Sequence, residues 1–491
     1  MKIAGFVAGA VLFVVLATAN AGGYRYGVSD QAYYLPAVAL AANPDLFPRD
    51  RVVLATQTGL MAADDALAAA VRLTGLDLPT VFLVAYALTL VALYGASIAF
   101  ARALGLSWWA TAACVLLLTF RHRIARTGAN SLEGYMHPRQ LAFALGVAAW
   151  ACLLRDRLGW AAGLTLAAGL VHPTTGLWFA ATVAVAVLWR LRMRPAGLAA
   201  AAVATGAVGI WAAVAGPLAG RFVTMDAAWL AVLADKDYLF PAEWPLYAWA
   251  TNLGAAAIIG LLYHARRTGG FARRQEAELV AGLAALVAAF VLSVPLTEAH
   301  LAVAVQLQVN RVFWLLDFVL AVYLAWWLTS GMRWSPRAVA AVVVTLAVLS
   351  AGRGAYLLTV EHAERGLVTR ALPATAWVDA MRWVAAQPID WHVLADPDHG
   401  WKYGVSVRAA GLRDTVLETG KDTAMAMYDR DVALRVADRL TALSDFERLS
   451  TADLRRLDDR YDLDVAVLSR HMTMDLPVLY QNDQFVVYDL R

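Results

Sequence analysis

The sequence predicts an α-helical polytopic membrane protein with about eleven membrane-spanning helices, followed by a small C-terminal α/β domain. Hydrophobic residues make up 60% of the 491-residue chain, charged residues make up 16%, and the mean hydropathy is +0.57. These values lie outside the range of soluble globular domains. Apolar segments long enough to cross a bilayer recur up to residue 356. The composition becomes polar from residue 357, which predicts two domains, 1–356 and 357–491.

The first predicted span covers residues 3–19 and follows Lys2. A basic start, an apolar core and Ala17–Ala19 also fit a cleaved signal peptide. We favour an uncleaved span, because it tethers the acidic segment that follows it. The other predicted spans are residues 79–101, 107–120, 140–154, 159–171, 175–190, 196–216, 245–264, 277–295, 309–330 and 337–356.

Arginines in the short loops predict the orientation, because cytoplasmic loops carry an excess of Lys and Arg. With the N-terminus in the cytoplasm, every even-numbered span is followed by arginine. The odd number of spans then places the first long loop, residues 21–78, and the segment from residue 357 on the outer face. The cytoplasmic arginines are Arg102, Arg155, Arg157, Arg190, Arg192, Arg194, Arg266, Arg267, Arg273, Arg274, Arg333 and Arg337.

The charge and cysteine content exclude several kinds of site. The net charge of +3 is small, and we expect no nucleic-acid partner. Both cysteines, Cys114 and Cys152, lie inside apolar segments, so neither a disulfide framework nor a thiolate metal site is expected. The bias toward Ala, Arg and Leu is typical of a GC-rich bacterial genome.

The segment 24–50 follows the first span directly and places Asp30 within a few residues of the membrane surface. An acid at the mouth of a membrane bundle is costly unless it faces water or a partner, which makes it a functional candidate. The alternative is a solvated acid that caps the helix beginning after it. The rest of the loop, including a helical pattern over 52–72, is typical of interfacial helices.

The outer loop 121–140, between spans three and four, runs against the charge rule. Arginines on the outer face require compensation, and an anionic ligand fits because guanidinium groups match phosphate oxygens in pairs. The alternatives are unspecific attraction to anionic lipid and a misplaced span. The basic and imidazole residues of this loop are Arg121, His122, Arg123, Arg126, His137 and Arg139.

Two further polar sites fall on the same predicted face. His172 begins HPTTG at the junction of spans five and six, where Pro and Gly interrupt the helix and leave backbone groups that can line a cavity. A structural hydrogen-bonding role is the alternative for this histidine. Gln306, Asn310 and Arg311 enter span ten, where we expect a polar inward face, with snorkelling of Arg311 to the surface as the alternative.

The C-terminal segment alternates helical and strand patterns. Helices are predicted over 376–387, 422–444 and 450–461. Strands are predicted over 392–396 and 465–469 and on both sides of the turn QND. DPDHG at 396–400 has residue types that bind metals, but its spacing favours a turn after a strand.

Taken together, these features resemble the GT-C superfamily of membrane glycosyltransferases. The resemblance covers most of the chain. The residues that carry it are Asp30 in YGVSDQAYYLPAV with LFPRD after it, HPRQ at 137–140, HPTTG at 172–176, Gln306 to Arg311, and the tail YDLDVAVLSR…LPVLYQNDQFVVYDLR.

The resemblance implies sugar transfer from a polyprenyl-phosphate donor to a glycan, lipid or protein acceptor on the outer face of the bacterial inner membrane. Asp30 would act at the acceptor, and Arg139, Arg311 and either Arg121 or Arg123 would hold the lipid phosphate. Many members of the family have paired acids in the first loop, whereas Gln31 follows Asp30 here, so a divalent metal is doubtful. A transporter, for which no internal repeat is found, and a lipid-binding scaffold remain alternatives.

Overall fold

The computed structural model describes residues 3–191 and 194–491. The chain divides into two compact units. The first comprises the described residues of Met1–Tyr24, Val84–Thr224 and Asp237–Val368, and the second comprises Arg25–Leu83, Met225–Lys236 and Thr369–Arg491. This division differs from a single boundary at residue 357, because most of the first loop clusters with the C-terminal segment. Arg192, one of the arginines used to predict orientation, lies outside the described residues.

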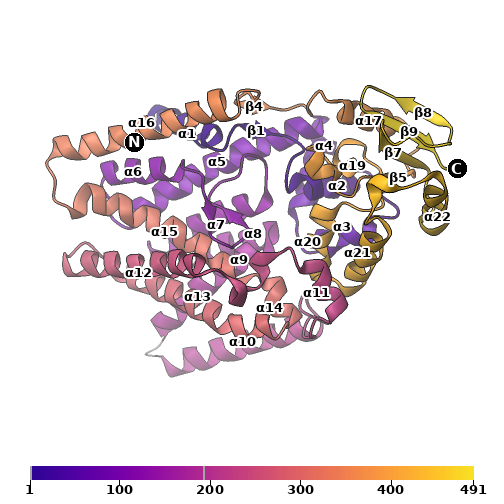
Figure 1. The fold of residues 1–491 in the computed structure, drawn as a ribbon. Coiled ribbons are helices and arrows are strands. Elements are labelled where there is room, and N and C mark those ends of the chain that lie inside the picture. The colour runs from indigo at the N-terminus through magenta and orange to yellow at the C-terminus, as the bar shows by residue number, and fades with distance from the viewer. Residues whose placement is uncertain (1–2, 192–193) are drawn as a thin grey trace. The chain divides into compact units, whose positions relative to one another are not determined.

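The first unit is built largely of helices (Figure 1). Each apolar segment predicted from the sequence coincides with a helix, and a short extra helix precedes the tenth. In chain order the helices are α1 (Ile3–Asn20), α5 (Leu78–Ala103), α6 (Trp108–Leu118), α7 (Pro138–Leu153), α8 (Leu158–Val171), α9 (Pro173–Leu191), α10 (Pro195–Val214), α12 (Leu246–Thr268), α13 (Arg274–Glu298), α14 (Ala302–Leu307), α15 (Val312–Trp326) and α16 (Pro336–Tyr356).

Helix length identifies the segments able to cross a bilayer. Among the described residues, eight helical segments are long and apolar enough to do so. Helices α6, α7 and α8 have 11, 16 and 14 residues, fewer than the roughly 20 that a full crossing needs. The chain is therefore a polytopic helical membrane protein, and the count of eleven spans stays a prediction.

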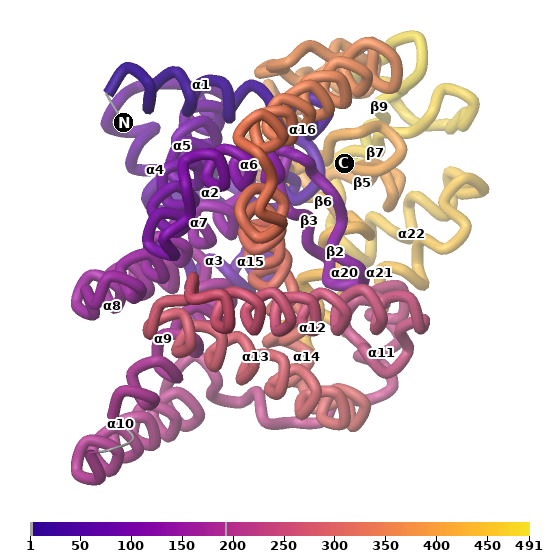
Figure 2. The backbone as a smooth tube through the Cα atoms, turned by 90° about the vertical axis from the view of Figure 1, so that its left-hand side faces the viewer, coloured from indigo at the N-terminus to yellow at the C-terminus, as the bar shows by residue number. Residues whose placement is uncertain are grey.

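Small residues allow helices α7, α8 and α9 to pack closely (Figure 2). A Cβ atom on Gly146 of α7 would lie 2.2 Å from the ring of Phe179 on α9. A Cβ on Gly176 of α9 would lie 2.3 Å from the backbone of Gly169 on α8. Close approach through glycine is the usual way membrane helices associate, because lipid supplies no hydrophobic drive between them.

Arg266 and Glu276, two buried charged residues inside the helices of the first unit, form an ion pair. Arg266 on α12 donates from Nε to Glu276 Oε1 on α13 at 2.6 Å, and the Tyr323 hydroxyl on α15 donates to the same carboxylate oxygen at 2.9 Å. Both Arg266 and Glu276 are buried. Pairing of this kind lowers the cost of a charge among apolar helices, and this cluster connects α12, α13 and α15.

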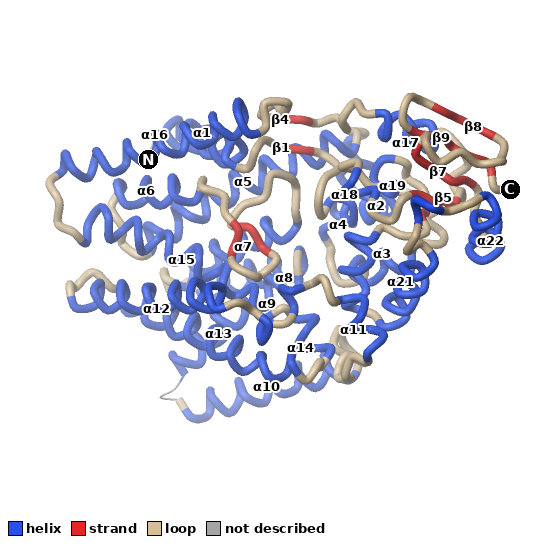
Figure 3. The backbone as a smooth tube through the Cα atoms, in the orientation of Figure 1, coloured by secondary structure: helices blue, strands red, loops and turns tan. Residues whose placement is uncertain are grey.

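The second unit contains a five-stranded mixed sheet (Figure 3). The strands lie in the order β6-β5-β7-β9-β8, with β5 parallel to β6 and β7, and β9 antiparallel to β7 and β8. Asn482 forms the predicted turn, because its Oδ1 accepts from the backbone N–H groups of Gln484 and Phe485. The strands are β5 (His392–Ala395), β6 (Asp414–Thr415), β7 (Val465–Ser469), β8 (Val478–Gln481) and β9 (Phe485–Asp489).

The remaining elements of this unit are mostly short helices. The predicted helix 422–444 is two helices, because Asp429 starts a new one by accepting from the N–H groups of Asp431 and Val432. The helices are α2 (Gln31–Ala42), α3 (Arg51–Thr58), α4 (Ala63–Thr74), α11 (Ala227–Leu233), α17 (Ala376–Ala385), α18 (His399–Lys402), α19 (Val407–Ala410), α20 (Thr419–Met425), α21 (Arg430–Ala442) and α22 (Thr451–Tyr461). Two further strands, β1 (Tyr24–Arg25) and β4 (Val368–Thr369), pair with each other, and the chain passes from one unit to the other within each of them.

A buried ionic network connects the first loop to the C-terminal segment inside this unit. Asp50 accepts from Arg408 Nε and from Arg435 Nη2, each at 2.7 Å. Arg408 also binds both oxygens of Asp422, at 2.5 and 3.0 Å. Burial opposes ionisation of Asp50, but Arg408 and Arg435 outweigh it and hold its pKa at about 2. The loop that carries Asp30 is thus attached to α19, α20 and α21.

Candidate functional site

The loop between α6 and α7 folds into a small hairpin in the first unit. Strands β2 (Arg123–Ile124) and β3 (Ala129–Asn130) pair antiparallel. The turn between them has Arg126 and Gly128 at φ values of 53° and 63°. The hairpin leaves Arg123 exposed and places the Gly128 carbonyl where Arg139 Nη1 donates to it at 3.3 Å.

Glu133 is the residue around which this loop is arranged. Its carboxylate accepts from Arg139 Nη2 and, at 3.0 and 3.2 Å, from Asn130 Nδ2. Arg121 Nη2 lies 3.8 Å from it. Its backbone N–H donates to Gln140 Oε1 at 3.1 Å. Glu133 and Arg139 are only 2% and 3% exposed. The loop therefore supplies its own counter-charge to Arg139, and we correct the expectation that an external anion is needed for that purpose.

Glu133 is absent from the residues predicted for the site, because the excess of arginine dominates the charge pattern of this loop. The available signal was one acid, six residues before Arg139, in a loop whose positive charge needed a partner. Arg126 has a counter-charge as well, since its Nη1 forms an ion pair with Asp237.

His137 and His172 lie next to each other beside Arg139. His137 caps α7, where its Nδ1 accepts from the Arg139 N–H at 3.2 Å, and Pro138 occupies the first helical position. The two imidazole rings are 6.2 Å apart between centroids. His172 separates α8 from α9 and is 7% exposed. Burial, followed by nearby His137, Arg311 and Arg139, holds the pKa of His172 well below its ordinary value.

The proton on neutral His172 has a defined place. The Thr175 backbone N–H, which can only donate, points at Nδ1 from 3.4 Å. The Thr175 hydroxyl lies 3.0 Å from the same nitrogen. Nδ1 is therefore the acceptor of the ring, and Nε2 carries the hydrogen. Through Nδ1, His172 has the structural hydrogen-bonding role that was the alternative from the sequence, and a functional role for this residue stays a prediction.

The polar face expected at the start of span ten is divided by a break in the helix. Gln308 has the left-handed φ of 48°, which ends α14 and starts a 3₁₀ turn over Val309–Arg311. Gln306 Oε1 accepts from Arg221 Nη1 at 2.8 Å. Asn310 Nδ2 instead donates to the carbonyl of Tyr238 at 2.6 Å. The expectation of one helical face is wrong, because Gln308 turns the chain between Gln306 and Asn310.

Aromatic side chains form one wall beside Arg139. Trp314 on α15 stacks on Phe143 of α7 with a centroid separation of 4.2 Å, and the Arg139 guanidinium lies over the Trp314 ring at 5.9 Å. The Trp314 Nε1–H donates to the Ser131 carbonyl at 3.4 Å. These contacts fix α7, α15 and the hairpin relative to one another within the first unit.

Asp30 belongs to the second unit. Its carboxylate accepts from Lys421 Nζ on α20 at 2.6 Å, and its side chain is 35% exposed. Although Asp30 precedes α2, its side chain makes no capping bond to that helix. Burial and then Lys421 lower the pKa of Lys236, so a second lysine also lies near this pair. The solvated-cap interpretation of Asp30 therefore does not describe its side chain.

The donor set around Asp30 does not suit a divalent cation. A metal site needs several oxygen or nitrogen ligands converging on one point, whereas Asp30 has an ammonium group beside it. In residues 3–191 and 194–491, no group of three or more His, Cys, Asp or Glu side chains is placed to hold a metal.

The structure therefore brings together four of the residues predicted for the site. His137, His172, Arg139 and Arg311 gather in the first unit, and Arg121 approaches them through Glu133. Arg123 lies on the exposed hairpin, and Gln306 and Asn310 bind other partners. Asp30 lies in the second unit.

No protein-family model matches the chain, and no curated protein matches it. Among solved structures, the chain is similar to the oligosaccharyltransferase of Archaeoglobus fulgidus, crystallised with a disulfide-tethered acceptor peptide that contains an NVT sequon. The match has a TM-score of 0.50 at 12% identity and covers 95% of this chain and 69% of that one. A likeness at this identity concerns the fold alone. This chain and the archaeal oligosaccharyltransferase share a fold.

Proposed function

We propose that this chain is a GT-C-type membrane glycosyltransferase. In this proposal it transfers a sugar from a polyprenyl-phosphate donor to an acceptor at the outer face of the bacterial inner membrane. The N-terminus lies in the cytoplasm and the C-terminal segment lies outside. The structural relative is described with an acceptor peptide, and we extend the acceptor class to proteins, glycans and lipids.

The observation that supports this function best is the cationic group in the first unit. Buried His172 has Arg311, Arg139 and His137 around it, in a fold shared with an oligosaccharyltransferase. Negative charge grows on a lipid phosphate as the bond between the sugar and the phosphate oxygen breaks. Fixed cationic donors in a site that excludes water stabilise that charge more than water does.

We propose different roles for the two arginines, on the basis of where each one lies. Arg139 donates to Glu133 and to the Gly128 carbonyl, so we give it a positioning role that also contributes positive field. Arg311 lies in the 3₁₀ turn before α15 and is half-buried. We therefore assign Arg311, together with the Nε2–H of His172, to the phosphate oxygens. Arg121, close to Glu133, adds to the positive electrostatic potential of the cluster. Arg123 lies on the exposed hairpin, so any contact with the donor would be made at the surface.

Asp30 is the proposed acceptor-side group. Its side chain is partly exposed, so an acceptor hydroxyl or amide can reach it. A carboxylate in contact with that group can receive its proton during transfer. Lys421 then holds the carboxylate in place by a charge-assisted hydrogen bond of 2.6 Å.

One observation favours a second candidate, a non-catalytic lipid-binding scaffold. Asp30 and Arg139, the two residues ranked highest from the sequence, each form an ion pair within the protein. Ion pairs of this kind also occur as purely structural contacts. The two candidates differ in whether the chain recognises a phosphate specifically.

Binding of farnesyl phosphate and of farnesol to the purified full chain in nanodiscs tests the proposal. We expect farnesyl phosphate to bind more tightly than farnesol. Arg311→Gln should weaken farnesyl phosphate binding about tenfold or more, because it removes charge-assisted hydrogen bonds. Arg337→Gln, on an exposed arginine, is the matched control and should bind as the parent does. Equal binding of the two ligands, or equal losses for the two variants, would contradict the proposal.

A further inference from the structure

Asp317 is an unusual residue for its position. It lies in α15, in the apolar sequence VFWLLDFVLAVYLAW, where it is the only charged residue. An acid in a membrane helix is costly and indicates a functional site unless it faces a partner or water. The partner of Asp317 is His122, whose Nε2 lies 2.9 Å from Oδ1. Neither residue belongs to the cluster around His172.

The geometry defines the protonation of His122. Its Nδ1 lies 2.9 Å from the Phe120 carbonyl oxygen, which can only accept. Its Nε2 faces the Asp317 carboxylate, so both ring nitrogens must donate and the ring is an imidazolium. The hydrogen bond that His122 donates to Asp317 raises the pKa of His122, while burial and Arg353 oppose that rise. The pair is therefore an ion pair with no net charge.

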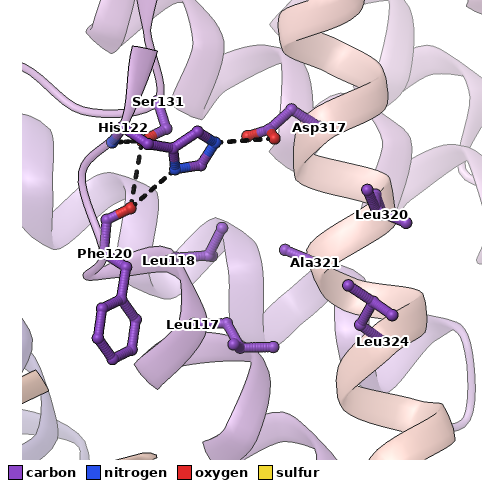
Figure 4. Close-up of a pocket in the computed structure, with 9 residues that line it drawn as sticks. All are labelled: Leu117, Leu118, Phe120, His122, Ser131, Asp317, Leu320, Ala321 and Leu324. Atoms are coloured by element: carbon purple, nitrogen blue, oxygen red, sulfur yellow. Dashed lines mark hydrogen bonds and ion pairs between the residues drawn. The ribbon is translucent and has the colours of Figure 1, made fainter. Parts of the chain in front are cut away.

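An apolar crevice of about 230 Å³ begins directly beneath this pair (Figure 4). Asp317, Leu320, Ala321 and Leu324 lie at the spacing of one helical stripe along α15. Leu117 and Leu118 of α6 face this stripe across the crevice, and the polar groups, His122, Ser131 and Asp317, gather at one end. This volume is below the roughly 300 Å³ of a typical pocket for a drug-sized ligand. It suits part of a single hydrocarbon chain.

The polar end has one acceptor atom left for a ligand. Both ring nitrogens of His122 already have partners, Phe120 and Asp317. The Ser131 hydroxyl accepts a hydrogen bond from the backbone N–H of His122 at 3.0 Å. Within the described part of the chain, no hydrogen bond reaches Asp317 Oδ2. A ligand head group must therefore donate a hydrogen bond. An anionic head would be repelled by the carboxylate oxygen that it meets, Asp317 Oδ2. An ammonium head would be attracted by that oxygen but opposed by the net positive charge of Asp317, His122 and Arg353 together.

We propose that the crevice between α6 and α15 binds a neutral lipid with a free hydroxyl group. The hydrocarbon chain lies between Leu117, Leu118 and the α15 stripe, and the hydroxyl donates to Asp317 Oδ2. The site is separate from the proposed phosphate site and does not depend on it. The charges of Asp317 and His122 at the polar end select a neutral head group. A groove lined by apolar side chains alone would bind lipids with any head group equally well.

Photocrosslinking tests the proposal with three probes that differ only in the head group: diazirine-bearing hexadecanol, hexadecanoic acid and hexadecylamine. The full chain in phosphatidylcholine nanodiscs is labelled, and crosslinks to residues 114–122 and 314–326 are counted by mass spectrometry. We expect the alcohol to label these segments about tenfold more than either charged probe, the scale of one hydrogen bond to a charged group. Equal labelling by all three probes would overturn the proposal.

Two variants make the test independent of the head-group comparison. Ala321→Trp fills the crevice and leaves His122 and Asp317 intact, so it should abolish alcohol labelling. Ala207→Trp, on the exposed face of α10, is the control and should label as the parent does. Asp317→Asn turns the acceptor atom into a donor and should favour the acid over the alcohol. Unchanged labelling in Ala321→Trp would overturn the proposal even if Asp317→Asn does not fold.

Discussion

Glu133 and Arg139 form a buried ion pair, in which Arg139 Nη2 donates to Glu133 Oε1 while both residues are at most 3% exposed. The pair closes the hairpin loop onto the first turn of α7. It also holds Arg139 beside His137 and over Trp314. A single acid therefore positions much of the cationic cluster.

We predict that Glu133→Gln destabilises the protein. Removing one member of a buried ion pair leaves the other charge uncompensated, which costs about 3–5 kcal/mol. The thermal unfolding temperature of the purified protein should fall accordingly. The double variant Glu133→Gln/Arg139→Gln should recover part of the loss, because the uncompensated charge is gone. Additive losses in the double variant would show that the two residues act independently.

We predict that Asp30→Asn keeps the fold and loses transfer. The substitution preserves size but removes the capacity to accept a proton, which lowers the rate by about 10²-fold or more. Asp45→Asn, at an exposed position, is the matched control and should retain activity. Asp50→Asn should instead unfold the second unit, because Asp50 is fully buried between Arg408 and Arg435. Full activity in Asp30→Asn would remove Asp30 from the mechanism.

His399 gives the second unit a defined response to pH. It is fully buried, and burial lowers its pKa to about 4. In the unfolded chain the pKa is about 6.5. The unfolded state therefore binds more protons between these values, so the contribution of His399 is complete above about pH 6.5 and is lost as the pH falls to about 4. The difference of about 2.5 pKa units corresponds to about 3 kcal/mol.

Comparison with His399→Gln isolates this group, because other residues such as Glu418 and His392 titrate in both proteins. Hydrogen exchange of residues 392–402 measures the local opening free energy between pH 7 and pH 4. The parent protein should lose about 3 kcal/mol more than His399→Gln over this range. Parallel curves for the two proteins would exclude His399 as the titrating group.

Topology is tested by reporter fusions. Eleven spans with a cytoplasmic N-terminus place Arg491 outside, so a reporter that is active only in the periplasm should be active when fused after it. A fusion in the loop after α5, next to Arg102, should be inactive in the same assay. Activity with the opposite pattern would reverse the orientation and remove the outer-face site.

Local patterns predicted most of the elements. Helices α5, α9, α12 and α13 follow from apolar length, and strands β5, β7 and β9 follow from short apolar runs beside turn residues. The break at Gln308 was missed because glutamine carries no signal for a left-handed backbone. The sequence pattern predicted one helix over 422–444 in place of α20 and α21. Asp429, a typical helix N-cap, is the local signal for the separation.

The partners of charged residues could not be predicted from local patterns. Lys421 is 391 residues from Asp30, and Arg408 is 358 residues from Asp50. Nothing in the nearby sequence indicates which distant charge will compensate a given acid. His137 and His172 could be predicted from local sequence, because each precedes a proline that begins a helix, in HPRQ and HPTTG. The two helix starts lie together, so the two imidazole rings are neighbours.

The most direct test of the proposed function is a cryo-electron-microscopy structure of the full chain in nanodiscs with farnesyl phosphate. We predict phosphate density in the first unit, with its oxygens about 2.7–3.2 Å from the Arg311 guanidinium and from His172 Nε2. Arg139 should remain bound to Glu133. Density for the phosphate at another place, or none at saturating ligand, would contradict the assignment of this cluster to a lipid-phosphate donor.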